Sequence, residues 1–282
     1  MLIRYDAKVR LLVVTKGHPY DRAAFSDLFD GLKGISWTHV EQPAAAQLIG
    51  AGGGLNYDLI LFYDVPGLQF RTPNPPDLVE PDQDFKQGFR DLLAAGKPLI
   101  FLHHAIAGWP LWDDYAEAIG ARFFYQPGRY KGRAHPDSGY LFPVTYHAEP
   151  VAPHPVTAGL EDGFELTDEL YLFDLLEDVV PILRARTDFD PARFHSARNA
   201  LAARMWTSDG WTPPKGTDLI AWARLAGRAP TVTLQCGNDG QTFTNPNFRL
   251  LLRNAIDWLL GPAAQDLAAQ QADKPQGPTH GA

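Results

Sequence analysis

The chain has 282 residues, 45% of them hydrophobic and 21% charged, which is ordinary for a globular protein and enough for one large domain or two modest ones. Its formal net charge of −8 argues against a non-specific nucleic-acid or anionic-membrane surface, because no basic excess is present to neutralise phosphates. The single cysteine, Cys236, excludes an internal disulfide framework and a cysteine-rich zinc site.

The first hundred residues alternate between short apolar segments and segments with helical spacing. Asp21 is placed to cap a helix that starts at Arg22. A second helix is expected over 84–95 and a weak one over 44–48, whereas the proline-rich stretch 67–81 has no periodicity and predicts a loop. The apolar or alternating segments predict strands at 8–15, 35–40, 57–63 and 99–102.

Beyond residue 120 the pattern is more irregular. Residues 120–140, rich in glycine, arginine and aromatic side chains, predict an irregular loop, and 164–171 is polar with mixed periodicity. An Asn-Pro pair starts a strongly amphipathic helix over 245–260, and the polar, aperiodic residues 261–282 predict a disordered tail. A short helix is expected over 112–119, and strands over 140–151, 179–184, 218–224 and 231–236.

These elements predict a single α/β domain over residues 1–260. Strand–helix units joined by short links are typical of a parallel, doubly wound sheet. No linker separates the strand-rich middle block, roughly 120–225, from the rest, so we interpret it as insertions built onto the same sheet.

The stretch from Gly96 to Gly108 is the most informative part of the chain. The apolar segment 99–102 is followed by His103 and His104, and then by small residues. A sharp strand-to-turn elbow of this kind holds a side chain at the carboxyl edge of a parallel sheet, where open α/β folds keep their sites. A continuing strand would point the two histidines to opposite sides, so at most one should face the site unless the turn reorients the second.

Polar residues also follow the other expected strands. Because the carboxyl ends of parallel strands meet at one edge, these residues should lie near the elbow histidines. Each one alone is explained by the ordinary polarity of strand ends, but the set favours a site. The residues are His18 after the first strand, Glu41 and Gln42 after the second, Asp64 after the third, and Cys236, Gly237 and Asn238 after the late strand.

Histidine is the side chain best suited to moving protons near neutral pH, and it is also the commonest metal ligand. No compact metal motif such as H-E-x-x-H is present, so the residue pattern leaves acid/base chemistry and a divalent ion such as Zn²⁺ or Mn²⁺ both open. The candidates for either role are His18, His103, His104, Asp64 and Glu169.

Other chemistries lack their motifs. The chain has no G-x-S-x-G elbow and no G-x-x-x-x-G-K-[ST] loop, and Cys236 has no adjacent histidine. Arg129 lies in a basic loop that suits an anionic or polyhydroxyl ligand, although a solvated loop explains it equally well. Tryptophans beside polar side chains are typical of carbohydrate sites; those in or beside loops here are Trp109, Trp112, Trp206 and Trp211.

Six segments, taken together and in order, resemble the ThuA-like (trehalose utilisation) family, which shares the fold of the class I glutamine amidotransferases. They span about residues 8 to 260, and they are specific to the family only in combination. The segments are Val13–Asp21, Tyr57–Asp64, Phe101–Ala105, His154–Leu160, Asp168–Tyr171 and Asn245–Trp258.

The resemblance implies a flavodoxin-like three-layer αβα sandwich with a mainly parallel central sheet and β-rich insertions. Related amidotransferases place a cysteine at the elbow and a His-x-Glu pair late in the chain. Here the elbow holds His103 and His104, and the late position runs from Gln235 to Asn238, where ThuA-like proteins often have Gly-His. Glutaminase activity is therefore not expected, because no thiolate lies at the elbow and no base is present to activate one.

The resemblance also implies a role in carbohydrate catabolism, and two functions remain open. One is an enzyme, such as a hydrolase, lyase or isomerase, that acts on a sugar or keto-sugar by histidine acid/base or metal-assisted chemistry. The other is a catalytically inactive amidotransferase-like module that binds a ligand or a partner protein. For the enzyme, the expected catalytic residues are His18, His103, His104, Asp64 and Glu169, and the expected substrate-binding residues are Arg129, Tyr171, Trp109, His154 and Asn238.

No apolar run approaches the ~18 residues of a membrane span, and the one near Leu11 is too short for the core of a signal peptide. We therefore expect a cytoplasmic protein that binds neither membranes nor nucleic acid. The expected partner is a small molecule, with a carbohydrate as the leading candidate, and homo-oligomerisation is left open.

Overall fold

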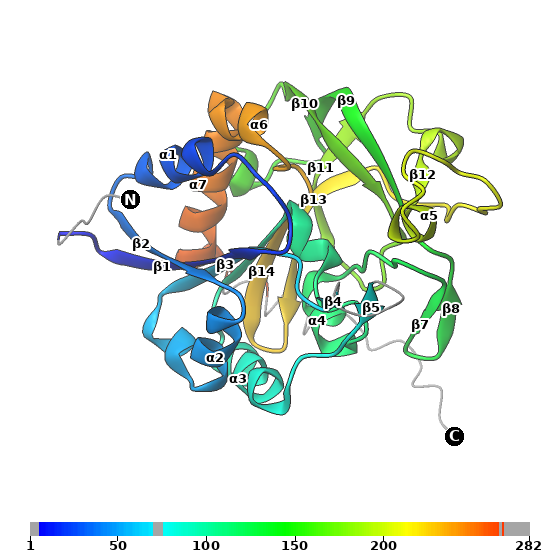
Figure 1. Ribbon diagram of the computed structural model, residues 1–282. Helices are drawn as coiled ribbons and strands as arrows, with labels where there is room; N and C mark the ends of the chain where they lie inside the picture. The colour runs from blue at the N-terminus through cyan, green and yellow to red at the C-terminus, as the bar shows by residue number, and fades with distance from the viewer. Residues whose placement is uncertain (1–5, 70–75, 265–266, 268–282) are drawn as a thin grey trace, which may run out of the picture.

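A computed structural model of the chain describes residues 6–69, 76–264 and 267. Its centre is five mutually parallel strands in the order β14-β6-β3-β1-β2, whose near-continuous apolar sequences are typical of strands buried on both faces (Figure 1). Their bounds are β1 (Val9–Lys16), β2 (Ile35–Glu41), β3 (Leu59–Asp64), β6 (Leu99–Leu102) and β14 (Ala229–Leu234).

Antiparallel strands extend this centre into one ten-stranded sheet. They continue from β14 in the order β13-β11-β9-β10, and β12 pairs with β9. The middle block of the chain is therefore built onto the same sheet, as the sequence predicts. These strands are β9 (Gly139–Pro150), β10 (Phe164–Leu172), β11 (Val180–Arg186), β12 (His195–Ser196) and β13 (Leu219–Ala226).

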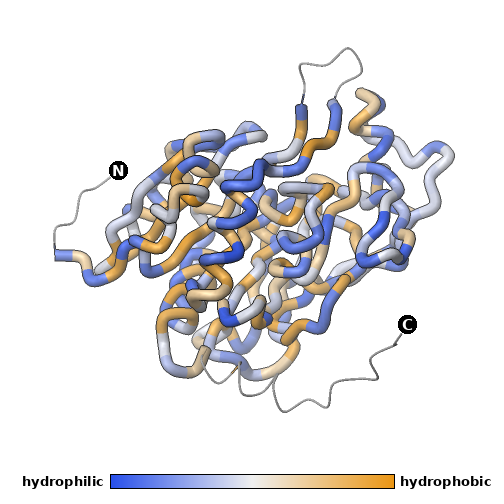
Figure 2. The backbone as a smooth tube through the Cα atoms, turned by 90° about the horizontal axis from the view of Figure 1, so that it is seen from below, coloured by the Kyte–Doolittle hydropathy of each residue, from blue (hydrophilic) through white to orange (hydrophobic). Residues whose placement is uncertain are grey.

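Helices cover both faces of the parallel strands. One buried cluster joins α1 and α7 to one face of β1, and a second joins α2, α3 and α4 to the other face. The helical turns alternate between hydrophobic and hydrophilic positions, as this packing requires (Figure 2). The helices are α1 (Arg22–Asp30), α2 (Ala44–Gly50), α3 (Gln83–Ala94), α4 (Asp113–Ile119), α5 (Ala197–Leu201), α6 (Gly240–Thr244) and α7 (Pro246–Leu260), with short 3₁₀ turns η1 (Gly53–Asn56), η2 (His103–Ala107), η3 (Pro155–Thr157) and η4 (Pro191–Arg193).

The predicted flavodoxin-like sandwich with β-rich insertions is confirmed, and so are the two helix starts read from capping residues. The Asp21 carboxylate accepts the Ala23 and Ala24 backbone N–H groups at 3.0 Å. Asn245 caps α7, with Pro246 in its first turn. No helix in the described part of the chain is long and apolar enough to cross a membrane.

One segment without an assigned element and two expected loops contain strands. The polar segment 164–171, for which the sequence predicts no element, lies in strand β10, which pairs with β9 and so has its backbone satisfied. The expected loop 120–140 contains a hairpin of β7 (Gly128–Tyr130) and β8 (Arg133–His135), and the expected loop 67–81 contains the small β4 (Leu68–Gln69) and β5 (Asp77–Leu78) pair.

The start of the expected tail is packed against the core. Ala264 and Leu267 are buried in the cluster that includes α7, so ordered chain continues past Gly261. The remainder of the expected tail, residues 265–266 and 268–282, lies outside the described residues.

Asp64, at the end of β3, is completely buried. Its Oδ2 accepts a hydrogen bond from Gln42 Nε2 at 2.8 Å, while its Oδ1 has no hydrogen-bond partner within the described ranges. Burial raises the pKa of this carboxyl from 3.8 to about 7, against the opposing effect of the Gln42 hydrogen bond. The folded state therefore holds the Asp64 proton more tightly than the unfolded chain does.

We predict that Asp64→Asn stabilises the protein increasingly as the pH rises. Between the ordinary pKa and the raised one, the wild type loses stability as the buried carboxyl is forced to ionise, and asparagine keeps a Gln42 acceptor without a charge. The gain in unfolding free energy should grow to at most about 4 kcal/mol between pH 4 and pH 7, because one pKa unit is about 1.4 kcal/mol. Chemical denaturation across this pH range measures it, with exposed Asp27→Asn as the control, and a gain independent of pH would contradict the assignment.

Candidate functional site

A cavity of about 360 Å³ opens where the chain leaves β1, β3 and β6, and β10 supplies its other side. This is the edge at which the sequence predicts a site, because parallel strands present their carboxyl ends there. The lining combines the imidazoles of His18 and His104 and the carboxylate of Glu169 with an apolar and aromatic wall. The other lining residues are Gly17, Val65, Leu68, Pro76, Ala107, Phe123, Tyr125, Tyr140, Tyr171, Ala197, Ala200, Leu201, Met205 and Trp206.

The predicted elbow exists, and it has a strained first residue. His103 follows β6 with a φ of +39°, a conformation that side-chain-bearing residues rarely adopt, and it starts the 3₁₀ turn η2. This turn replaces the strand alternation that would have sent the two histidines to opposite sides. As a result His104 lines the cavity while His103 lies fully buried beside it, and their ring centroids are 4.4 Å apart.

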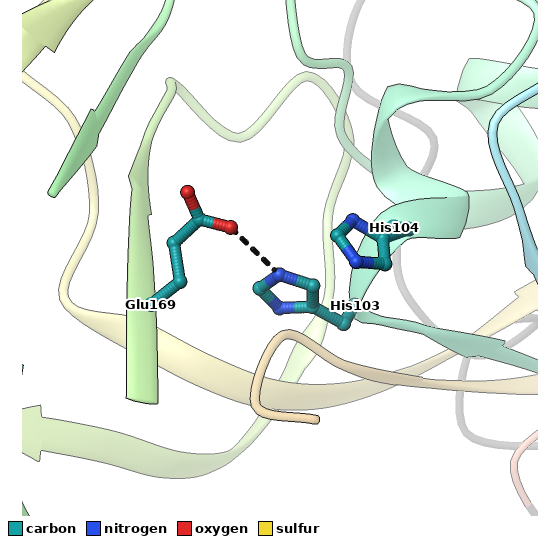
Figure 3. Close-up of side chains that lie close together, drawn as sticks. All are labelled: His103, His104 and Glu169. Carbon is teal, nitrogen blue, oxygen red and sulfur yellow. Dashed lines mark hydrogen bonds and ion pairs between the residues drawn. The ribbon is translucent and has the colours of Figure 1, made fainter. Parts of the chain in front are cut away.

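His103 is held at both ring nitrogens. Its Nδ1 donates to the Gln235 backbone carbonyl, and its Nε2 lies 3.1 Å from Glu169 Oε2 (Figure 3). Burial lowers the pKa of His103, but the hydrogen bond and the charge of Glu169 outweigh it, and the net pKa is raised. The raised pKa favours an imidazolium–carboxylate ion pair at pH 6.5 and below.

His104 has the opposite electrostatics. Its Nδ1 lies 3.0 Å from the Tyr171 hydroxyl, whereas its buried Nε2 has no hydrogen-bond partner among the residues that the structure describes. Burial, and then repulsion from His103 and His18 when those rings are protonated, hold its pKa well below the ordinary value. His104 is thus a neutral imidazole beside a charged one, with one ring nitrogen left for another molecule.

His18 packs its ring against His104, with centroids 3.3 Å apart. Its two ring nitrogens face the backbone carbonyls of Pro19 and Tyr63, at 3.0 and 3.2 Å. Burial lowers the pKa of His18 to about 4, so this ring is also neutral at pH 7. The close turn before it depends on Gly17, where a Cβ would lie 2.5 Å from the Val65 carbonyl oxygen.

Two residues that the sequence argument missed hold Glu169 in place. A register shift in the β9–β10 pairing falls between Asp168 and Leu170, and a bulge of this kind re-aims a side chain. The buried Asp168 carboxylate accepts the Glu169, Gly237 and Asn238 backbone N–H groups at 2.9, 2.7 and 3.1 Å. Gln235 adds a hydrogen bond from its amide to the Glu169 carbonyl at 3.0 Å. In the sequence, Asp168 stands out only as the first residue of the segment Asp168–Tyr171, and Gln235 only as the start of the late position that ends at Asn238.

Several residues predicted for the site do not line this cavity. Asp64 lies buried beneath it against Gln42, and Asn238 contributes its backbone, donating to Asp168 and accepting from the Tyr63 hydroxyl at 2.8 Å. Neither residue is among those that line the cavity, and the contacts given for them support the strand ends.

The remaining substrate-binding candidates are placed by local contacts elsewhere. Arg129 donates to the Gly132 carbonyl within its own hairpin, at 2.6 Å. Trp109 packs against Phe85, with ring centroids 5.3 Å apart. His154 caps η3 by accepting the Val156 N–H. Short-range hydrogen bonds and packing hold these three side chains, and none of them is among the residues that line the cavity.

Aromatic side chains form much of the cavity wall. Tyr171, a predicted site residue, lies there with Tyr125 and Tyr140, which carried no signal in the sequence. Of the four tryptophans noted in or beside loops, Trp206 lines the cavity, whereas Trp109, Trp112 and Trp211 do not. An apolar platform with a few polar groups is the usual composition of a small-molecule site.

One group of side chains could hold a metal ion. Ligand atoms of His103, His104 and Glu169 all lie within 4.8 Å of one another, as Figure 3 shows for their arrangement. The donor set of two imidazoles and a carboxylate suits Zn²⁺, Mn²⁺ or Fe²⁺. Ligation would require Glu169 to release His103 Nε2, since that nitrogen already faces the carboxylate.

Cys236 does not offer a nucleophile. Its side chain is fully buried, and burial raises the pKa of the thiol, so the thiolate is not populated near neutral pH. The elbow position after β6 is held by His103 instead.

Comparison with known proteins agrees with this fold and places the chain in a family. Two solved structures described as putative ThuA-like proteins resemble it. The one from Parabacteroides merdae ATCC 43184 has a TM-score of 0.61 at 13% identity, covering 89% of this chain and 90% of that one. The one from Bacteroides uniformis ATCC 8492 has a TM-score of 0.58 at 15% identity, covering 92% and 94%.

A β-galactosidase from Rahnella sp. R3 matches with a TM-score of 0.50 at 11% identity, but over only 31% of its own length, which reflects a shared fold. No curated protein sequence matches the chain. The profile of the ThuA family, described as trehalose utilisation, matches residues 12–259. Since this match covers most of the sequence, the chain belongs to the ThuA (trehalose utilisation) family.

Proposed function

We propose that this protein is an enzyme that transfers protons to and from a sugar or keto-sugar bound in the cavity between β1, β6 and β10. The observation that carries the proposal is the juxtaposition of a neutral His104, whose Nε2 is unpartnered among the described residues, with the charged His103–Glu169 pair. Neighbouring groups whose environments drive their pKa values apart are the usual arrangement of a catalytic base and acid.

His104 serves as the base. Its lowered pKa keeps it unprotonated at neutral pH, and the contact between its Nδ1 and Tyr171 fixes the ring. With the proton on Nδ1, the lone pair of Nε2 is free to accept a proton from a hydroxyl or from a carbon next to a carbonyl.

His103 serves as the acid. Glu169 favours its protonated form, the Gln235 carbonyl holds its Nδ1 proton, and its Nε2 proton lies against Glu169, so that proton reaches a substrate through the Glu169 carboxylate. Glu169 itself lines the cavity and is well placed to orient a substrate hydroxyl. Proton transfer by a positioned group typically contributes about 10²- to 10⁴-fold to a rate.

The choice of a carbohydrate rests on two supports. The family to which the chain belongs is described by trehalose utilisation, and the cavity pairs aromatic walls with a few polar groups, as sugar sites do. The competing function, an inactive binding module, is favoured by the lack of an elbow cysteine. It gives no role to the opposed pKa values of His103 and His104. A cytoplasmic location and a small-molecule partner remain part of the proposal.

We predict that His104→Gln and His103→Gln each lower turnover by roughly 10²-fold or more while leaving the fold intact, because each removes one of the two proton carriers. A thermal-shift screen of sugars and keto-sugars first identifies a ligand that is converted. Turnover is then measured with circular dichroism as the check on folding. His147→Gln, a partly exposed strand position outside the cavity lining, is the control. Full activity in both variants would remove the two histidines as the proton carriers, whereas a protein that binds sugars but converts none would belong to the binding-module class.

The pH profile should have a broad top around pH 6.5. Activity should fall on the acid side only well below pH 6.5, where His104 takes up a proton, and on the alkaline side above it, where His103 loses one. Glu169→Gln removes the charge that raises the pKa of His103, so the alkaline limb should move to lower pH. Measuring kcat/KM against pH for both proteins tests this, and an unmoved limb would remove His103 as the acid.

Chelation separates proton transfer from metal-assisted chemistry. We expect turnover to survive dialysis against EDTA, because the Gln235 carbonyl and the Glu169 carboxylate already engage both His103 ring nitrogens. The assay compares turnover and metal content before and after dialysis. Activity that is lost and then restored by one divalent ion would instead make His103, His104 and Glu169 its ligands.

A further inference from the structure

The mouth of the cavity carries two exposed hydrophobic side chains that its catalytic floor does not use. Met205 and Trp206 are 50% and 53% exposed, whereas His104 and Glu169 lie deeper, with side chains almost or largely buried. Both mouth residues also line the cavity. A tryptophan that is half exposed at a cavity is not explained by packing in the hydrophobic core. Its ring face is therefore available to a ligand.

The backbone that presents Trp206 is strained. Ala203 and Trp206 have φ values of +59° and +61°, in the left-handed region that residues with a β-carbon rarely occupy. Two such residues within four positions persist only where surrounding contacts determine the conformation, and such strain gathers at ligand-binding segments.

Surrounding hydrogen bonds do determine this conformation. The Trp206 N–H donates to the Tyr140 hydroxyl at 2.9 Å, and the following Thr207 carbonyl accepts the Ser196 N–H at 3.0 Å. The buried Asn199 amide donates to the Asp209 carbonyl at 3.1 Å, on the far side of the same loop. The indole meets the Tyr140 and His195 rings edge-on, at 5.3 and 5.7 Å. The ring is therefore fixed before any ligand arrives, which reduces the entropy lost on binding.

The chemistry around Trp206 selects the ligand. Its neighbours in the lining from the same segment are Ala197, Ala200, Leu201 and Met205, all apolar. The Tyr140 hydroxyl, on the same wall of the cavity, already accepts the Trp206 N–H. A second sugar ring placed here would leave most of its hydroxyls without protein partners, whereas an apolar or aromatic group would pack on the indole face.

We propose that Trp206 is a specificity-determining platform for the aglycone, and that the substrate is a glycoside whose sugar faces His104 and Glu169 while an aromatic or similarly apolar aglycone rests on Trp206. This proposal rests on the proposed function for the sugar half of the substrate, and adds the chemical class of the other half. It predicts that the preferred substrate differs from a disaccharide such as trehalose, whose two halves are equally polar.

The test compares matched ligands. Methyl and phenyl glucosides of the same anomer, and trehalose, are titrated into the full-length protein by calorimetry. We expect phenyl glucoside to bind at least ten-fold more tightly than methyl glucoside or trehalose. Trp206→Ala should reduce the ratio of the phenyl to the methyl glucoside affinity to near one, with little change in the affinity for methyl glucoside. Trp206→Phe should retain much of this ratio. Leu111→Ala, equally hydrophobic, 44% exposed and outside this cavity's lining, is the control and should change nothing.

The outcomes distinguish the two proposals. The platform would be overturned if phenyl and methyl glucoside bind with equal affinity, or if neither binds. It would also be overturned if the ratio of the two affinities is unchanged in Trp206→Ala. A ratio that depends on Trp206 in a protein that converts no sugar or keto-sugar would support the platform and remove the proposed reaction.

Discussion

The carboxylate of Asp168 is the contact on which the rest of the site depends. It accepts three backbone N–H groups, one from its own strand and two from the loop after β14, and so joins β10 to the centre of the sheet. Gln235, the first residue of that loop, uses its carbonyl to hold His103 and its side-chain amide to hold the Glu169 backbone. A buried carboxylate is costly unless it is fully hydrogen-bonded. Here the hydrogen bonds that satisfy Asp168 also hold the strand that carries Glu169 beside His103.

The parallel half of the fold could be predicted from sequence because its signals are local. Apolar segments such as 59–64 and 99–102 are recognised as strands without knowledge of their pairing partners. Asp21 indicates the start of α1 because aspartate is a common helix N-cap. The rule that strand ends meet at one edge then placed His18 and the elbow histidines together. By contrast, β10 is stabilised by pairing with β9, a partner that periodicity cannot reveal, so its polar sequence gave no strand signal.

The site was predictable in position but not in detail. Whether both elbow histidines could approach one another depended on the backbone turning at His103, a left-handed residue that no local pattern indicates. Tyr140 and Gln235 act through contacts that span more than 60 residues of chain, which a single sequence does not encode visibly. Arg129 and His154 have the residue types of a binding site, yet hydrogen bonds to near neighbours decide where they lie.

The charge balance of the cavity floor restricts what can bind there. The His18 and His104 rings are tilted against each other with centroids 3.3 Å apart, so charging both would place two like charges in a poorly solvated space. Burial keeps both rings neutral. The one positive charge, on His103, is neutralised by Glu169, and no lysine or arginine lies among the described residues that line the cavity. A phosphorylated or carboxylated sugar would therefore bring a negative charge to a cavity floor that has no free positive charge to pair with it. The cost of desolvating the phosphate or carboxylate would then be uncompensated. Uncharged sugars and keto-sugars meet no such penalty, which is the physical reason that the floor and the apolar mouth together suit a neutral glycoside.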